Sequence, residues 1–367
     1  MEVELNMLNN TPNNTPNDLY IKDTLLNNTQ HEIISVKNQM SSKVGRDKVL
    51  SIVICREWEN IFVDLIINPI VIFELNDTDL EFDYTRIFRS IWIGIGGTQI
   101  DKLNQNQIML YLAKYNLKVV CNERKVFFPI PIQCVLGGLF SSKCMAHDIR
   151  FTFDFSNSPI IDCIDNMSLQ TDFVMCKTKP DYAKIRDAGI KYYTKNNTAK
   201  KNNAQDYFFQ KYENNGYLSL IYQNQTEIFD NLLSGGDNIK IKLGFNHEVK
   251  KIYLYMEDKN TKVIYKGKGF EHLEFIANGY IALEMNWEEM VLESEMNSNL
   301  PNGIYQIDWE NKCDKIYKGV SLSRIDSLIL RLSEICVPSS NVSLVICADN
   351  INYLLYSNNM SGVAFSN

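Results

Sequence analysis

The sequence predicts an all-β protein that consists of two β-sandwiches in tandem, with few short helices. From residue 49 onward, short apolar runs alternate with Asn, Asp and Gly, and few segments have a convincing helical period. A polar segment, residues 181–215, interrupts this pattern and leaves stretches of similar length on either side. Apolar residues make up 45% of the chain and charged residues 22%, so each stretch can bury a core of its own.

The N-terminal 45 residues differ from the rest in composition. Residues 9–16 repeat Asn-Asn-Thr-Pro twice, a sequence of turn formers with little apolar surface. Such a segment gains too little from burial to offset the entropy of ordering. We therefore predict a disordered N-terminal arm over residues 1–45, with ordering on contact with a neighbour as the alternative.

The predicted first sandwich spans residues 46–180. Its clearest strand is residues 149–155, where Ile and Phe alternate with Arg150, Thr152 and Asp154. Residues 91–95 form another strand, which leads into a turn at Gly96-Gly97. Apolar residues spaced three and four apart from Ile108 to Tyr115 predict a helix between these strands.

The predicted linker or long loop at residues 181–215 precedes a second sandwich, residues 216–367. Strands are expected over residues 239–245, 252–256 and 342–346. Tyr253 and Tyr255 alternate with apolar neighbours, so they either pack against a second surface or lie at the rim between the sheets. Residues 322–335 fit a helix and a strand equally well.

The sequence contains no convincing catalytic, cofactor or metal site. The Gly94–Gly97 segment lacks the helix and third glycine of a dinucleotide-binding loop. The isolated histidines are predicted to be structural, with His147 and His247 on different sandwiches, and Glu288, Glu289, Glu293 and Glu295 are predicted to form a solvated loop. The histidines are His31, His147, His247 and His272.

Cysteine spacing and net charge narrow the classes of partner. The nine cysteines are scattered without a Cys-x-x-Cys pair, so we predict free thiols rather than a zinc site. The net charge of −7 does not favour direct binding of nucleic acid. The sequence contains no run of eighteen apolar residues, so it does not predict a membrane-spanning helix.

Several segments of the first half form a recognisable series. Residues 89–102 combine a strand with a Gly-Gly turn and Ile-Asp-Lys, residues 128–132 and 145–150 follow, and residues 168–174 come last. In this order they resemble the double jelly-roll major capsid proteins of nucleocytoplasmic large DNA viruses. The first segment resembles the strand and turn of the first jelly roll, the next two are similar to its Leu-Pro-Phe segment and the strand that follows, and the last resembles the strand that closes this domain.

The second half carries further motifs in the family's order. Residues 245–252 resemble Phe-Asn-His-Pro-Val-Lys-Glu-Leu, and residues 323–326 match Ser-Arg-Ile-Asp. The C-terminal residues 352–367 resemble the family's Gly- and Ser-Asn-containing end. Glu248 replaces a proline, and the aromatic residues of a Pro-Phe-Trp-Phe element are missing at residues 131–134. The chain thus resembles a short, divergent member.

The resemblance implies a structural role without enzymatic activity. It implies a double jelly roll, with residues 322–335 as a strand, and a homotrimer with a pseudo-hexameric outline that tiles an icosahedral shell. It also implies a place in the virion after assembly in the host cytoplasm, with contacts to neighbouring capsomers, minor capsid proteins and an internal membrane. A scaffold or minor capsid protein of the same fold is the alternative, and a cupin-like or carbohydrate-binding sandwich is a more distant one.

Overall fold

The computed structural model divides into two compact units. It describes residues 31–40, 43–54, 63–76, 83–136, 147–176, 216–230, 238–297, 299–316, 322–337, 341–357 and 360–363. The first unit contains residues 1–104, 115–221 and 353–366, and the second contains residues 105–114 and 222–352. The prediction placed the two sandwiches at residues 46–180 and 216–367. A short helix from the first half belongs to the second unit, and the C-terminal segment belongs to the first.

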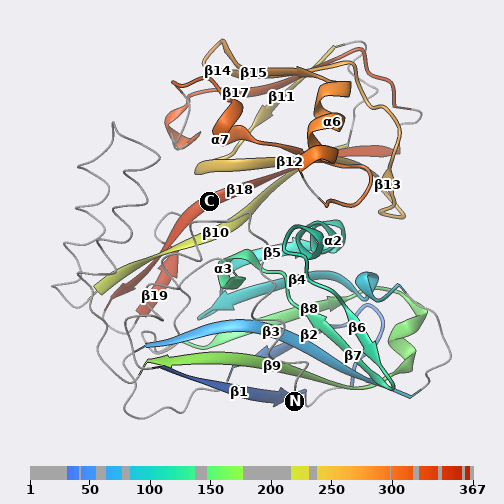
Figure 1. Cartoon of the computed structure of the whole chain (residues 1–367), viewed down its shortest axis with the longest axis vertical. Helices are drawn as coiled ribbons and strands as arrows, with labels where there is room; N and C mark the ends of the chain where they lie inside the picture. The colour runs from blue at the N-terminus through green and yellow to red at the C-terminus, as the bar shows by residue number, and fades with distance from the viewer. Residues whose placement is uncertain are drawn as a thin grey trace. The chain divides into compact units, whose positions relative to one another are not determined.

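The first unit is a sandwich of two antiparallel sheets (Figure 1). One sheet has the strand order β1-β9-β3-β7-β6, and the other has the order β2-β8-β4-β5. The strands are β1 (His31–Gln39), β2 (Val49–Val53), β3 (Val63–Leu75), β4 (Phe88–Ile95), β5 (Thr98–Asn104), β6 (Val120–Asn122), β7 (Lys125–Pro129), β8 (Ile149–Phe155) and β9 (Ile164–Cys176). Short helical segments lie at η1 (Tyr84–Arg86), α3 (Gln133–Leu136) and η2 (Pro159–Cys163).

The second unit repeats this arrangement. Its sheets have the orders β10-β18-β12-β13 and β11-β17-β14-β15, and β16 pairs with β12. The strands are β10 (Gly216–Phe229), β11 (Asn238–Leu243), β12 (Glu248–Asp258), β13 (Ile264–Tyr265), β14 (His272–Ala277), β15 (Tyr280–Asn286), β16 (Ile304–Ile307), β17 (Leu328–Ser333) and β18 (Val342–Ser357). The helical segments are α2 (Gln105–Lys114), α6 (Trp287–Asn297), α7 (Trp309–Lys312) and η5 (Leu322–Arg324). At the chain end, β18 also pairs with β19 (Met360–Val363).

Both units have the same strand order when eight main strands are numbered in sequence. Without the short strand β6, the first unit has sheets in the order 1-8-3-6 and 2-7-4-5. Without β13, the second unit has the same two orders, with β16 as the sixth strand beside β12. Eight strands in two such antiparallel sheets make a jelly roll, so the predicted fold class is confirmed.

Aromatic side chains from both sheets fill the core of the first unit. Phe88 on β4 lies 5.1 Å from Phe128 of the opposite sheet, between ring centroids, and 5.3 Å from Phe153. Phe73 on β3 lies 5.7 Å from Phe88. All four rings are fully buried, as the alternation in residues 149–155 predicted for β8. Phe88 therefore joins the two sheets at the centre of the core.

The β4–β5 hairpin depends on two glycines. Gly96 and Gly97 have φ angles of 55° and 90°, the left-handed region that a two-residue hairpin turn requires. A Cβ atom on Gly96 would lie 2.9 Å from Cγ of His147. The turn predicted at Gly96-Gly97 is thus confirmed, and the packed histidine gives Gly96 a second reason to be glycine.

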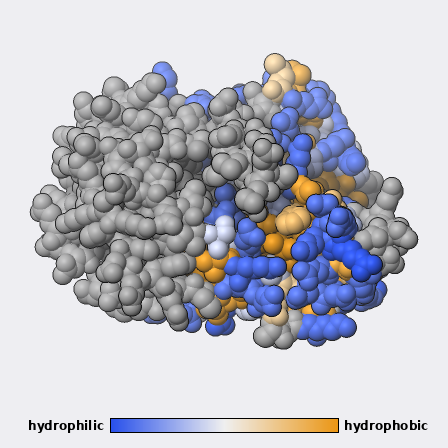
Figure 2. Space-filling view, turned by 60° about the horizontal axis from the view of Figure 1, so that its bottom comes forward, coloured by the Kyte–Doolittle hydropathy of each residue, from blue (hydrophilic) through white to orange (hydrophobic). Residues whose placement is uncertain are grey.

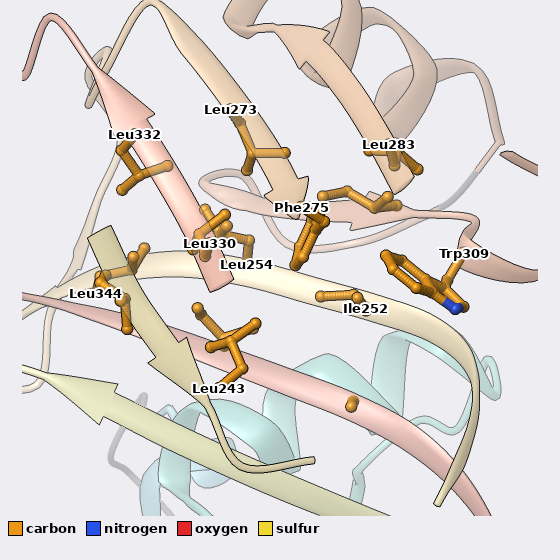
Figure 3. Packing of buried hydrophobic residues seen from close by; sticks show 14 of the residues in the cluster. Leu243, Ile252, Leu254, Leu273, Phe275, Leu283, Trp309, Leu330, Leu332 and Leu344 are labelled. Carbon is orange, nitrogen blue, oxygen red and sulfur yellow. The ribbon is translucent and has the colours of Figure 1, made fainter. Parts of the chain in front are cut away.

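The core of the second unit is built largely from leucines and isoleucines of both sheets, with Trp309 at one end of the group shown in Figure 3. Leu254 and Ile252 project from β12, whereas Phe275, Leu330 and their neighbours project from the facing sheet. The Phe275 ring lies 5.3 Å from Trp309, between centroids, in an edge-to-face contact. The strands predicted at residues 239–245, 252–256 and 342–346 supply this core as β11, β12 and β18.

Three expectations need correction. The predicted disordered arm is wrong for His31–Gln39, which form β1 and pair with β9, whereas residues 1–30 lie outside the described residues. The ambiguous segment splits into the 3-10 turn η5 and strand β17. The acidic residues after 287 form helix α6 rather than a loop, because Asn286 and Glu289 cap its first turn reciprocally. The predicted linker at 181–215 lies outside the described residues.

Replacing Phe88 with Ala tests the core of the first unit. Since the ring contacts both sheets, the resulting cavity is expected to lower the free energy of unfolding by about 3–5 kcal/mol. Urea unfolding monitored by circular dichroism measures this change. Tyr280→Ala is the control, because its side chain is 73% exposed, and it should change stability by less than about 0.5 kcal/mol. Equal effects of the two substitutions would contradict the assignment of Phe88 to the core.

Candidate functional site

The outer face of β12 carries Tyr253 and Tyr255, and helix α2 provides its cover within the second unit. Both tyrosines are fully buried, and the Tyr111 ring of α2 lies 6.2 Å from the Tyr253 ring, between centroids. The predicted second packing surface for these tyrosines therefore belongs to the same chain. Their hydroxyl groups do not lie at a solvent-exposed rim. The helix predicted from Ile108 to Tyr115 is confirmed as α2.

The first turn of α2 is attached to β12 by a buried carboxylate. Asn106 Nδ2 lies 2.6 Å from Oε2 of Glu257 and 3.0 Å from the carbonyl oxygen of Lys262. Lys262 Nζ lies 2.9 Å from the other oxygen of Glu257. Glu257 therefore has both a hydrogen-bond donor and a cation, which a buried carboxylate requires.

The last turn of α2 meets Asp349 of β18. Tyr111 Oη donates to Oδ1 of Asp349 at 2.6 Å, and Lys114 Nζ lies 2.5 Å from Oδ2. The Asp349 and Lys114 side chains are 4% and 14% exposed. Burial raises the pKa of Tyr111, and the charge of Asp349 raises it further. Burial, and then the Lys114 charge, lower the pKa of nearby Lys251.

The first turn of α2 also approaches a thiol. Gln107 Nε2 lies 3.2 Å from Sγ of Cys347, and the same amide contacts Oγ1 of Thr226 on β10. Burial raises the pKa of the Cys347 thiol to about 12. The thiol is therefore protonated near neutral pH and serves as packing rather than as a nucleophile. The cysteines found free in the described part are Cys121, Cys134, Cys163, Cys313, Cys336 and Cys347.

The histidines do not converge. His147 lies in the first unit and His247 in the second, as predicted. His247 is buried, and its Nε2 lies 3.3 Å from Nδ2 of Asn352, which also donates to Gln223. His272 is exposed at the start of β14, and the His31 side chain lies outside the described part. Among the described residues, no group of three His, Cys, Asp or Glu side chains could hold a metal ion.

The outer face of the sheet β2-β8-β4-β5 is hollowed around Gly94. The hollow has a volume of about 620 Å³ and is bordered by Trp92, His147 and Arg150. Lys102 Nζ lies 5.2 Å from the centroid of the Trp92 ring. A sugar would need to stack on the face of the Trp92 ring, but Lys102 of the same chain already lies over that ring. The glycines between Gly94 and Gly97 form a hairpin rather than a phosphate-binding loop.

Large apolar side chains are exposed mainly on the second unit, in the part of the chain that the structure describes. On the face in Figure 2, hydrophobic residues reach the surface between hydrophilic ones. The side chains more than half exposed are Val49, Tyr280, Leu292, Met296 and Ile316. Leu292 and Met296 lie four residues apart on α6. A contiguous exposed apolar surface, rather than a single exposed side chain, is typical of a protein interface.

Comparisons with known proteins identify the fold. No family model matches the sequence, and no curated protein matches it. One solved structure that resembles it is PBCV-1 VP54, fitted into a cryo-EM reconstruction of the virophage Sputnik. Its TM-score is 0.63 and its sequence identity is 16%, and the match covers 92% of this chain and 98% of that chain. The Faustovirus major capsid protein has a TM-score of 0.52 and 8% identity, covering 90% of this chain and 91% of that one. The STIV MCP has a TM-score of 0.52 and 10% identity, covering 88% and 96%.

These likenesses confirm, at the level of the fold, the resemblance noted in the sequence. The matched structures cover most of both chains, so the likeness extends over both units rather than one. No helix in the described part is long and apolar enough to cross a membrane.

Asp349→Ala tests the attachment of α2. The substitution leaves the Lys114 ammonium and the Tyr111 hydroxyl without their buried acceptor, and it should lower the free energy of unfolding by about 3–5 kcal/mol. Asp162→Ala is the matched control, because Asp162 pairs with Arg46 at the surface, where the two side chains are 60% and 39% exposed. The control should cost less than about 1 kcal/mol. Chemical denaturation measures both, and a similar loss for both variants would refute the buried attachment.

Proposed function

We propose that this chain is a viral capsid protein whose function lies in contacts between copies rather than in chemistry. The observation that carries the proposal is the repeated eight-strand order in two units, together with the likeness to capsid proteins over about nine tenths of the chain. Two similar lobes in one chain allow three copies to form a trimer with a pseudo-hexameric outline. Such a trimer can tile an icosahedral shell as a hexamer would.

The proposal places the chain in the virion as a major capsid protein, after assembly in the host cytoplasm. Its partners are two further copies in a permanent trimer, with a large apolar interface, and then neighbouring capsomers through weaker polar contacts. Minor capsid proteins and an internal membrane complete the set of partners. We propose no catalytic role and no direct contact with nucleic acid, in keeping with the net charge of −7.

A scaffold or minor capsid protein of the same fold is the second candidate. A scaffold would be present in immature particles and absent from purified mature virions, whereas a shell protein would be abundant in both. A cupin-like or carbohydrate-binding sandwich is a further alternative. Metal analysis of the purified protein tests the first of these, since a resident metal at one equivalent per chain would contradict the structural role.

The mass and outline of the purified protein test the trimer. We expect a mass three times the 42.4 kDa of the chain by light scattering, and hexagonal particles in negative-stain images. The hexagonal outline follows from two lobes per copy. A stable monomer at micromolar concentration, or a trimer with three separate lobes in outline, would count against this architecture.

Assembly of trimers into larger particles should depend on ionic strength. With a charge of −7 on each chain, trimers repel one another, and salt screens this repulsion over about 10 Å at 0.1 M. Raising the salt concentration from about 0.02 to 0.2 M is expected to speed assembly, as measured by light scattering over time. A rate that stays constant across this range would show that charge repulsion does not control the association of trimers.

A further inference from the structure

Helix α6 has one face packed on its own unit and another face without cover from the described residues. Met290 and Ser294 are buried, and the Ser294 hydroxyl contacts the backbone of β16 at Ile304 and Gln306. On the other side, Leu292 is 58% exposed and Met296 is 75% exposed. An exposed leucine and methionine on successive turns of a helix form an apolar strip suited to a partner surface.

The two units place a helix at the same point in the jelly roll. In the first unit the fifth main strand, β5, ends at Asn104, and α2 begins at Gln105. In the second unit the fifth main strand, β15, ends at Asn286, and α6 begins at Trp287. The helices α2 and α6 are therefore equivalent elements of a repeated fold, although α2 clusters with the unit that follows it.

Equivalent positions of the two helices differ in their exposure. The second, third and tenth residues of α2 are Asn106, Gln107 and Lys114, which attach it to the outer face of the sheet that contains β10, β18 and β12. In α6 these positions are Glu288, Glu289 and Met296, and all three side chains are exposed. The seventh position differs, because Glu293 pairs with Lys312 of its own unit where α2 has Tyr111. The two ends of the face that α2 uses for docking are thus the parts that α6 leaves open.

The first unit has a surface equivalent to the one that α2 covers. It is the outer face of the sheet β1-β9-β3-β7, which we call the receiving face. The register of the paired strands places its side chains in two rows that run across the four strands. Neighbouring residues Val71, Phe73 and Phe128 are buried on the opposite, inner side. The receiving face consists of Lys37, Gln170, Ile70 and Pro129 in one row and Gln39, Ser168, Ile72 and Phe127 in the next. Ser168 and Ile72 are already buried within the chain, whereas the other six side chains are partly or fully exposed.

We infer that α6 docks on the receiving face of a second copy of this chain, as α2 docks within the second unit. The inference rests on the proposed function, because it names the surfaces through which copies join. Leu292 and Met296 would cover Ile70 and Phe127, which are only partly buried. Glu289 of α6 occupies the position of Gln107 in α2, and Gln107 contacts Thr226 on β10, the first strand of the second unit. The equivalent first strand of the receiving face is β1, which carries the exposed Lys37. Glu289 would therefore lie near a lysine of opposite charge.

This contact is heterologous, because it joins the helix of one copy to the receiving face of another. Each copy supplies one helix and one receiving face, and a head-to-tail contact of this kind closes into a ring when the rotation between copies permits. A trimer is the ring in which three helices fill three receiving faces. No helix and no receiving face then remains open.

Two variants test the two halves of the contact. The helix variant is Leu292→Ser with Met296→Ser, and the face variant is Ile70→Ser with Lys37→Glu. Light scattering after size-exclusion chromatography should show at least a tenfold weaker association for each, with a single-chain mass at about 1 μM. Tyr280→Ser is the control, since it removes an equally exposed side chain of the second unit, and its mass should equal that of the unaltered protein. Melting temperatures within 2 °C, on the order expected for changes at exposed sites, verify that the helix variant folds.

Mixing the two variants gives the sharper result. The helix variant retains an intact receiving face, and the face variant retains an intact α6, so one contact can form between them. We expect a heterodimer and no trimer in the mixture. Because Lys37 is exposed, Lys37→Glu alone serves as a second face variant that cannot fail through loss of a core contact.

The outcomes separate this inference from the proposed function. If the unaltered protein is a trimer and the helix variant is a trimer of equal stability, the docking of α6 is refuted while the capsid proposal stands. If the unaltered protein is a monomer, the proposed trimer fails, and the inference fails with it. Monomeric variants that restore a dimer on mixing support both the surfaces and the head-to-tail arrangement.

Discussion

A sheet with large apolar side chains on both faces has to be covered on both faces, and the second unit depends on this requirement at β12. Ile252 and Leu254 face the core between the sheets, whereas Tyr253 and Tyr255 point the other way and are still fully buried. Helix α2 contributes the cover, and its polar ends meet Glu257 and Asp349. The aromatic rings provide the burial, and the two carboxylates determine where along the sheet the helix lies.

Local pattern predicted the strands because burial on one face leaves a period of two in the sequence. Residues 149–155 and 252–256 are strands for this reason. The pattern did not predict β1, since residues 31–39 have no clean alternation and gain their order from nine paired positions on β9. It also did not place the start of β15, although Asn278-Gly279, with φ angles of 50° and 86°, forms the tight turn that precedes it.

The candidate site was predictable only in part. The spacing of Ile108, Tyr111 and Leu112 predicted the α2 helix, but an apolar stripe does not say which surface will bury it. The partners Glu257 and Asp349 are more than 140 residues away in sequence, and no spacing rule links residues at such a separation. The acidic run in α6 indicates a solvated loop by its charge alone, whereas the capping pair Asn286 and Glu289 starts a helix there.

The place of α2 in the chain has a consequence for synthesis on the ribosome. Lys114 is separated from Asp349 by 235 residues, so the helix emerges long before its docking strand exists. At a translation rate of about 5–20 residues per second, this delay is roughly 10–50 s. During that time the Tyr111 surface has to be held by transient contacts or by chaperones. The second lobe can therefore reach its native state only after Asp349 has been synthesised, which makes products truncated before this residue prone to aggregation.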